Sequence, residues 1–116
     1  ARGFINNGAR FLTIQANDAW LQNSSGVRQH FELARLRAVE LRTGIIRSAN
    51  TGISGVIDPS GRVKHKVNFY DQEVFKGKIL LNKSLTFYAR FGNLFSMICF
   101  ILVLIQGVYI SIRKKQ

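Results

Sequence analysis

Four short groups of residues in this chain have types and spacings that could do chemistry. They are Asn17-Asp18-Ala19-Trp20, Gln29-His30, Arg37-Ala38-Val39-Glu40 and Asn50-Thr51-Gly52. Amide and carboxylate side chains at the carboxyl ends of strands can line an active site, because open α/β folds bind ligands at that edge. The same side chains can also shape a loop by bonding to their own backbone, and the sequence leaves both roles open.

The candidate residues divide into two sets. Asn17, Asp18, Trp20 and Asn50 are candidates for an active-site loop or for substrate binding, with Trp20 either contacting lipid acyl chains or packing over a sheet. Three others are assigned structural roles: Arg37, Glu40 and Gly52. We expect Arg37 and Glu40 to form buried or partly buried ion pairs that fix a helix on the sheet, because an unpaired buried charge is costly. Gly52 is expected to adopt a backbone conformation that other residues resist.

Several other chemistries have no support in the sequence. Ser54 has no His–Asp partners at a recognisable spacing, and His30 at a helix start is interpreted as structural. There is no phosphate-binding Gly-rich loop and no Cys/His/Asp cluster with metal-ligand spacing, so no cofactor or metal is expected. Cys99 lies among apolar residues and is interpreted as a small buried hydrophobe.

A long apolar segment closes the chain. From Phe91 to Ile112 there are 22 consecutive residues without a charge, which as a helix would span about 33 Å, enough to cross a bilayer. Arg113, Lys114 and Lys115 follow, so the positive-inside rule places the C-terminus in the cytoplasm and residues 1–90 across the membrane. The net charge of +11 is spread along the chain and not clustered with aromatics, so a membrane surface is expected as partner and nucleic acid is not.

The part before this segment predicts alternating strands and a helix. Strands are expected at 11–14, 45–49, 53–57, 62–67 and 78–81, with a tight turn at 58–61. The helix is expected from Val27 to Leu41, because apolar residues recur there at steps of 4, 3, 4 and 3. Ser24 or Ser25 is expected to cap its start and Gly44 to end it. The class is α/β, but one helix and a few strands leave apolar faces uncovered, which suggests missing upstream sequence.

These motifs, in this order, resemble the C-terminal part of the apolipoprotein N-acyltransferases, the integral-membrane branch of the nitrilase superfamily. Ile57-Asp58-Pro59 with Gly61, and the run Thr86–Gly92 before the apolar segment, add to the resemblance. Leu21-Gln22 departs from the Phe-Gly usual in that family. The resemblance implies a partial nitrilase-like α-β-β-α sandwich over residues 1–90, facing the periplasm. A transmembrane helix over 91–112 and a basic cytoplasmic tail over 113–116 would follow.

The resemblance also implies a reaction. In that family a Cys thiolate attacks a phospholipid acyl ester, and the resulting thioester passes its acyl chain to the N-terminal S-diacylglyceryl cysteine of a lipoprotein. A Glu serves as base and a Lys stabilises the oxyanion, and all three would precede Ala1. The chain alone is therefore expected to be inactive. The whole enzyme is expected to be a multi-pass, monomeric protein of the inner membrane whose partners are phospholipid and diacylated apolipoprotein.

Two alternatives remain at this point. The chain could be a small non-enzymatic protein with one membrane span, whose basic part binds anionic lipid or a partner. A soluble amidase-type relative of the nitrilases is disfavoured by the terminal apolar segment.

Overall fold

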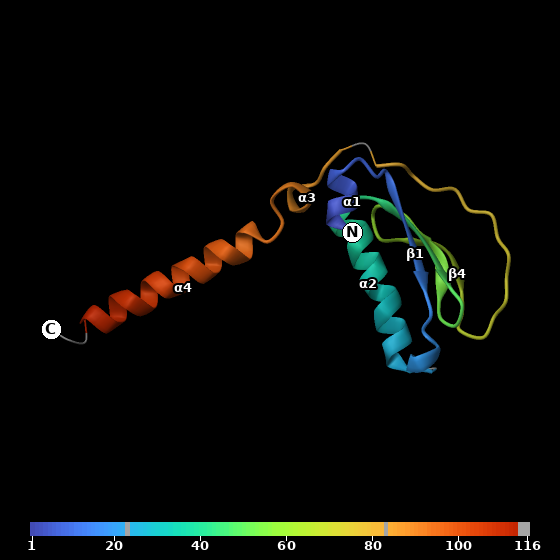
Figure 1. Cartoon of the computed structure of the whole chain (residues 1–116), viewed down its shortest axis with the longest axis horizontal. Coiled ribbons are helices and arrows are strands. Elements are labelled where there is room, and N and C mark those ends of the chain that lie inside the picture. The colour runs from blue at the N-terminus through green and yellow to red at the C-terminus, as the bar shows by residue number, and fades with distance from the viewer. Residues whose placement is uncertain (23, 83, 114–116) are drawn as a thin grey trace.

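The computed structural model describes residues 1–22, 24–82 and 84–113 and has a four-stranded sheet at its centre. The strands lie in the order β1 (Phe11–Ala16), β2 (Gly44–Ala49), β3 (Ser54–Ile57) and β4 (Val63–Val67). β1 and β2 are parallel, and the other neighbours are antiparallel. The helices are α1 (Arg2–Asn6), the 3₁₀-helix η1 (Ala19–Leu21), α2 (Ser25–Leu41), α3 (Phe87–Phe91) and α4 (Leu94–Arg113) (Figure 1). The α/β class is confirmed.

Helix α2 connects the parallel strands β1 and β2 and covers one face of the sheet (Figure 1). Ser24 caps its start, where the hydroxyl accepts a hydrogen bond of 3.2 Å from the Gly26 amide. The expected apolar stripe is confirmed, because its five members are all buried: Val27, Phe31, Ala34, Ala38 and Leu41. Four of them pack with Ile45, Ile53 and Ile57 of the sheet side to form the main core.

The end of α2 differs from the expectation. Arg42, not Gly44, takes the left-handed conformation that ends the helix, with φ 45° and ψ 46°. Gly44 is the first residue of β2, and a Cβ there would lie 2.5 Å from Ile79 Cγ1 and 2.9 Å from the Leu80 carbonyl oxygen. Gly44 therefore permits the close approach of another segment, which local sequence does not reveal.

The turn between β3 and β4 is built around Asp58. Its Oδ1 atom accepts hydrogen bonds from the Ser60 amide, the Ser60 hydroxyl and the Arg62 amide, at 2.8, 2.6 and 3.0 Å. Gly61, at φ +80°, lies against α2, where Arg35 Nε donates to its carbonyl oxygen. The expected turn is thus confirmed, and it is tied to the helix.

The strand expected at 78–81 is absent, because residues 71–81 carry no strand in the structure. These residues cross the sheet on the face away from α2, passing over Gly44 and Val56. Both edges of β2 are already occupied by β1 and β3, so no ladder position is free there. The segment instead pairs at one point before β1, where the Asn82 amide donates to the Arg10 carbonyl oxygen at 2.6 Å.

Helix α4 projects away from the sheet and α2 (Figure 1). It is 20 residues long with a mean hydropathy of 2.3 over its most apolar window, and none of that window is buried. Within the described residues it is the one helix long and apolar enough to span a membrane. The apolar run is divided: α3 ends at Phe91, Gly92 turns the chain with φ +61°, and α4 begins at Leu94.

The described residues form two layers, the sheet and α2, with residues 71–77 lying over part of the other face. The second sheet and outer helix layer of a nitrilase-like sandwich are not present among these residues, so that expectation stays a prediction.

Apolar side chains are exposed to solvent on the outer side of α2, where Leu33, Leu36 and Val39 are each about half exposed. Phe11 on the edge strand β1 is 41% exposed. These faces are the uncovered apolar surfaces expected from the sequence.

Candidate functional site

Asn17, Asp18, Asn50 and Gly52 lie together where the parallel strands β1 and β2 end. Ala16 pairs with Ala49 in the ladder, so the segments that follow start side by side. The Asn50 amide donates to the Ala16 carbonyl oxygen at 3.0 Å, and the Asp18 amide donates to the Thr51 carbonyl oxygen at 2.8 Å. The Asn17-Asp18 and Asn50-Thr51-Gly52 motifs are therefore joined through their backbones into one edge of the sheet.

Asp18 is the centre of this edge. Its side chain is 1% exposed, and its Oδ2 atom lies 2.7 Å from Arg47 Nη2, whose side chain is also 1% exposed. Arg47 Nε donates a second hydrogen bond, of 3.0 Å, to the Ile53 carbonyl oxygen. A buried ion pair with its hydrogen bonds satisfied fixes the geometry of the elements that carry it. Asp18 thus holds the end of β1 against β2 and the loop before β3.

His30 completes the buried group from the side of α2. Its Nδ1 atom lies 2.7 Å from Asp18 Oδ1 and 3.3 Å from Arg47 Nη2, and its side chain is 44% exposed. The Asp18 carboxylate is already paired with Arg47, so His30 is placed to hold the orientation of that carboxylate. This agrees with the structural interpretation of His30.

The packing of the Asp18 carboxylate requires a glycine at position 52. It has φ +152°, and a Cβ there would lie 2.5 Å from Asp18 Oδ2 and 3.0 Å from Ala49 Cβ. Both the backbone conformation and the packed carboxylate exclude a side chain. The Asn-Thr-Gly motif therefore ends in glycine because the Asp18 carboxylate occupies the adjacent space.

Asn17 and Trp20 point to different roles. Asn17 Oδ1 accepts a hydrogen bond of 3.2 Å from the Ala19 amide, so this side chain shapes its own loop. Trp20 lies on η1 and is 77% exposed, outside the buried group of Asp18. A large exposed aromatic side chain at this edge is available for an apolar partner.

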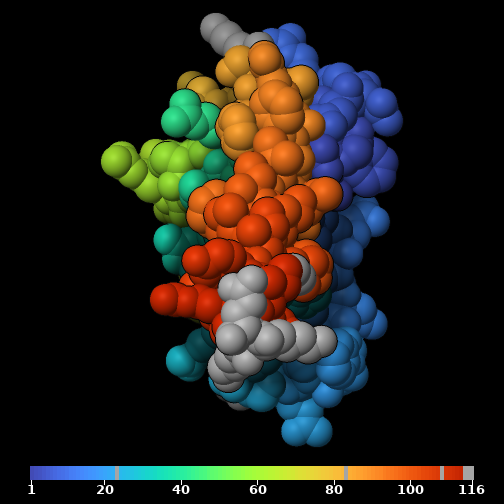
Figure 2. Space-filling view, turned by 90° about the vertical axis from the view of Figure 1, so that its left-hand side faces the viewer, coloured from blue at the N-terminus to red at the C-terminus, as the bar shows by residue number. Residues whose placement is uncertain are grey.

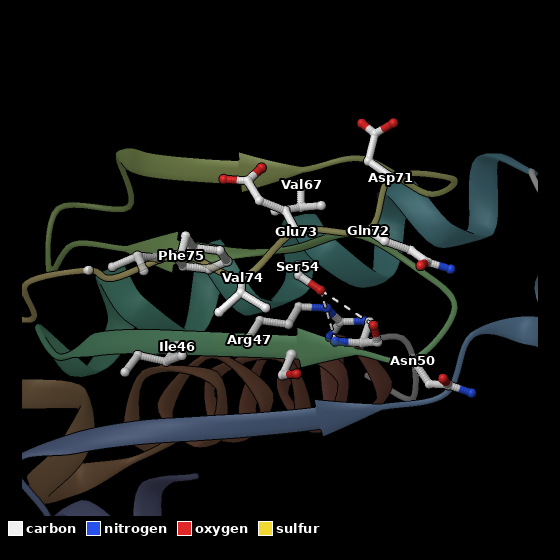
Figure 3. Close-up of a pocket in the computed structure, with 14 residues that line it drawn as sticks. Ile46, Arg47, Asn50, Ser54, Val67, Asp71, Gln72, Glu73, Val74 and Phe75 are labelled. Carbon is white, nitrogen blue, oxygen red and sulfur yellow. Dashed lines mark hydrogen bonds between the residues drawn. The ribbon is translucent and has the colours of Figure 1, made fainter.

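A groove of about 660 Å³ lies beside the edge, between the sheet and the segment that crosses it (Figure 3). Its apolar wall includes Ile46, Val56, Val67, Val74 and Phe75, and Asn50 lies at its end. The crossing segment is held in place by Glu73 Oε1, 2.8 Å from His65 Nε2, and by Phe75, whose ring centroid lies 4.3 Å from that of His65. Polar and charged side chains share the lining, among them Arg47, Gln72 and Glu73, so a ligand bound there would meet both apolar and polar groups.

Ser54 lines the groove but is engaged by the backbone. Its Oγ atom accepts a hydrogen bond of 3.0 Å from the Ala49 amide, which closes the loop between β2 and β3. In the part of the chain that the structure describes, no His lies in hydrogen-bonding distance of this hydroxyl. Nor do three His, Cys, Asp or Glu side chains group there as metal ligands.

Arg37 and Glu40 form the expected partly buried ion pair, but it does not lie against the sheet. They pair with each other one turn apart on α2, and Arg37 Nη1 lies 3.5 Å from the Tyr88 hydroxyl on α3. The nearby charge of Glu40 raises the pKa of the Arg37 guanidinium above its usual value. The Thr86 hydroxyl donates to the Glu40 carbonyl oxygen at 2.7 Å. The pair therefore faces the segment leading to α4, and the expected contact with the sheet is not seen.

Arg47 was not singled out from the sequence. The signal available was an arginine between apolar residues in a short strand, Ile45-Ile46-Arg47-Ser48-Ala49. In a strand whose neighbours are buried such a charge needs an acidic partner, and only six acidic residues are available in the chain.

Comparison with known proteins gives the family. No protein-family model matches the chain. It is 35% identical over 99 residues to a Geobacter metallireducens protein named apolipoprotein N-acyltransferase, covering 85% of the chain and 19% of that protein. Proteins of the same name from Thermotoga maritima and Shewanella oneidensis are 33% and 31% identical, covering 96% and 99% of the chain and 22% of each relative. The chain thus spans about a fifth of the length of these relatives, and over that span it belongs to the apolipoprotein N-acyltransferase family.

Proposed function

We propose that this chain forms the C-terminal part of an apolipoprotein N-acyltransferase. The observation that carries the proposal is the similarity of 31–35% identity that extends over most of the chain to several proteins of that name. The apolar helix α4 after an α/β unit supports it, because an enzyme that uses phospholipid must work at a membrane.

In the proposed reaction a Cys thiolate attacks the acyl ester of a phospholipid, releasing the lysophospholipid and forming a thioester. The α-amine of a lipoprotein's N-terminal S-diacylglyceryl cysteine then takes the acyl chain and frees the thiolate. The Cys, the Glu base and the Lys that stabilises the oxyanion would come from a preceding part of the protein. Cys99 is not a candidate for the nucleophile, because it lies on the apolar helix α4.

The role proposed for this chain is to build one edge of the active site. Asp18, Arg47 and Gly52 hold that edge rigidly, so Asn50 is presented at the end of the groove. Trp20, exposed on η1, is proposed to contact acyl chains. The nitrilase-like sandwich would be completed by the preceding part of the protein against the uncovered apolar faces of β1 and α2.

The proposed location is the bacterial inner membrane. In this arrangement α4 spans the bilayer, the sheet and α2 lie in the periplasm, and the basic C-terminus is cytoplasmic. About 30 Å of helix is available from its 20 residues, which matches the hydrocarbon core.

The test is acyl transfer by the longer protein and by the isolated chain. The purified 116-residue chain is expected to form no thioester with phospholipid and to transfer no acyl group. In the longer protein, Asn50→Ala is expected to lower kcat/KM by about tenfold or more, equivalent to at least about 1.4 kcal/mol of transition-state stabilisation. Asn68→Ala, an exposed asparagine after β4, is the matched control and should leave the rate unchanged. Acyl transfer by the isolated chain, or equal rates for both variants, would contradict the proposal.

A further inference from the structure

The short helix α3 lies at a fixed place relative to α4. It ends at Phe91, and α4 begins at Leu94. If α4 spans the bilayer, as proposed above, its 20 residues give about 30 Å and leave no surplus length beyond the hydrocarbon core. The two residues between the helices therefore place α3 at the level of the lipid headgroups.

One side of α3 is packed and the other is apolar and open. Ala89 is fully buried in a small core with Ile5 and Leu41. Phe87 and Phe91 are 65% and 54% exposed, and their ring centroids lie 4.7 Å apart. Two phenylalanines in contact on the open side of a helix at headgroup level are placed to meet lipid and not water.

Helix α1 is fixed to α3 and extends the same surface. Arg2 Nε donates to the Ala89 carbonyl oxygen at 2.9 Å, and Nη2 donates to the Arg90 carbonyl oxygen at 3.1 Å. A Cβ on Gly92 would lie 2.5 Å from Arg2 Nη1, so the glycine leaves room for this clamp. Phe4 on α1 is 69% exposed. In Figure 2 the residues of α1 and of the 85–95 segment lie side by side on the face from which α4 emerges.

We propose that α1 and α3 form a membrane-docking surface around the base of α4. Its apolar part is an aromatic collar, Phe4, Phe87, Phe91 and Phe95, in which each ring is more than half exposed. These rings enter the boundary between headgroups and acyl chains, while the positive charges of Arg2 and Arg90 attract phosphate groups. The inference rests on the proposed membrane span of α4.

The consequence is a fixed height of the sheet above the lipid. Without the surface, the turn at Gly92 would allow the α/β unit to tilt on a single helix. With α1 and α3 seated, the active-site edge at Asn50 and Trp20 keeps one distance from the phospholipids whose acyl chains it is proposed to receive.

The test uses tryptophan fluorescence of the whole chain in vesicles of phosphatidylethanolamine and phosphatidylglycerol. The only native tryptophan is removed by Trp20→Phe, and single reporters are introduced by Phe87→Trp, Phe91→Trp, Leu102→Trp or Tyr70→Trp. The Phe87, Phe91 and Tyr70 side chains are all more than half exposed, so the substitutions replace no buried side chain. Lipids brominated near the headgroup or near the chain end act as shallow and deep quenchers.

The collar variants Phe87→Trp and Phe91→Trp are expected to be quenched at least twofold more by the shallow than by the deep bromines. Leu102→Trp, in the middle of α4, should show the reverse, and Tyr70→Trp should be quenched by neither. Quenching of Leu102→Trp without quenching of the collar variants would overturn the docking surface and leave the span intact. An unquenched Leu102→Trp would overturn the span itself, and with it the docking surface.

Discussion

Removing the charge of Asp18 should destabilise this protein far more than removing the charge of an exposed carboxylate at the same distance from its arginine. Asp18 and Arg47 are each 1% exposed and their N···O distance is 2.7 Å. Asp18→Asn leaves the Arg47 guanidinium buried with the Ile53 carbonyl oxygen and no compensating charge. Breaking a buried pair from one side typically costs about 3–5 kcal/mol, and because asparagine retains one acceptor we expect about 3 kcal/mol here.

The chain contains a matched control for this prediction. Glu32 Oε2 also lies 2.7 Å from Arg35 Nη1, but the side chains of Arg35 and Glu32 are 40% and 58% exposed. Exposed pairs are worth about 0–1 kcal/mol, so Glu32→Gln should change the free energy of unfolding by no more than about 0.5 kcal/mol. The two pairs share a distance and differ mainly in burial and in the contact of Asp18 with His30, so the comparison measures the cost of leaving a buried arginine without its carboxylate.

The assay is urea unfolding followed by circular dichroism, with the whole chain in a mild detergent that keeps α4 in a micelle. Arg47→Met and the double variant Asp18→Asn/Arg47→Met complete a double-mutant cycle. The double variant should be about 2 kcal/mol more stable than the sum of the single effects predicts, because no charge is then left buried. A cost for Asp18→Asn as small as that for Glu32→Gln, or an additive cycle, would refute the account of the buried pair.

Three further predictions follow from single contacts. Gly52→Ala should lower the free energy of unfolding by about 2–4 kcal/mol, since strained backbone and an overpacked carboxylate are combined; equal stability in the same urea assay would exclude the contact. The pKa of Asp58 is lowered to about 2 from 3.8, because hydrogen bonds from Ser60 and Arg62 and the nearby Lys64 outweigh the larger single effect of desolvation, which raises it. The ionised carboxylate therefore stabilises the fold above about pH 5 by at most about 2 kcal/mol, and this is lost as the pH falls from 4 to 2. Asp58→Asn should flatten unfolding free energy against pH in that range, and an unchanged slope would contradict the pKa. Arg2→Gln should free α1 from α3, seen as faster amide hydrogen exchange in residues 2–6, whereas unchanged protection would show that the clamp is not needed.

Local periodicity explains which elements the sequence predicts well. The apolar stripe of α2 and the turn at Asp58 depend on residues within a few positions of one another, and both are found as expected. β1, β2, β3 and β4 also lie within one or two residues of their expected positions, because each is a short apolar run bounded by turn residues.

The errors at residues 78–81 and at Gly44 arise from contacts between distant segments. Residues 78–81 have the composition of a strand, but no free edge is available beside β2. The local sequence predicts that Gly44 ends the helix, because nothing local indicates that Ile79 and Leu80 cross over it. The site shows the same division. The motif residues Asp18 and Gly52 could be named from the sequence, whereas Arg47, which pairs with Asp18, lies 29 residues away, and nothing near it in the sequence indicates which acidic residue it pairs with.

The central claim, that these residues are the C-terminal part of a membrane acyltransferase, is tested most directly by the size of the protein that carries them. Native membranes are immunoblotted with an antibody raised against residues 62–78. Because the chain spans 19–22% of its relatives, the account predicts a band about five times larger than 13.1 kDa. A band near 13.1 kDa alone would contradict it and favour a small single-span protein with a binding role.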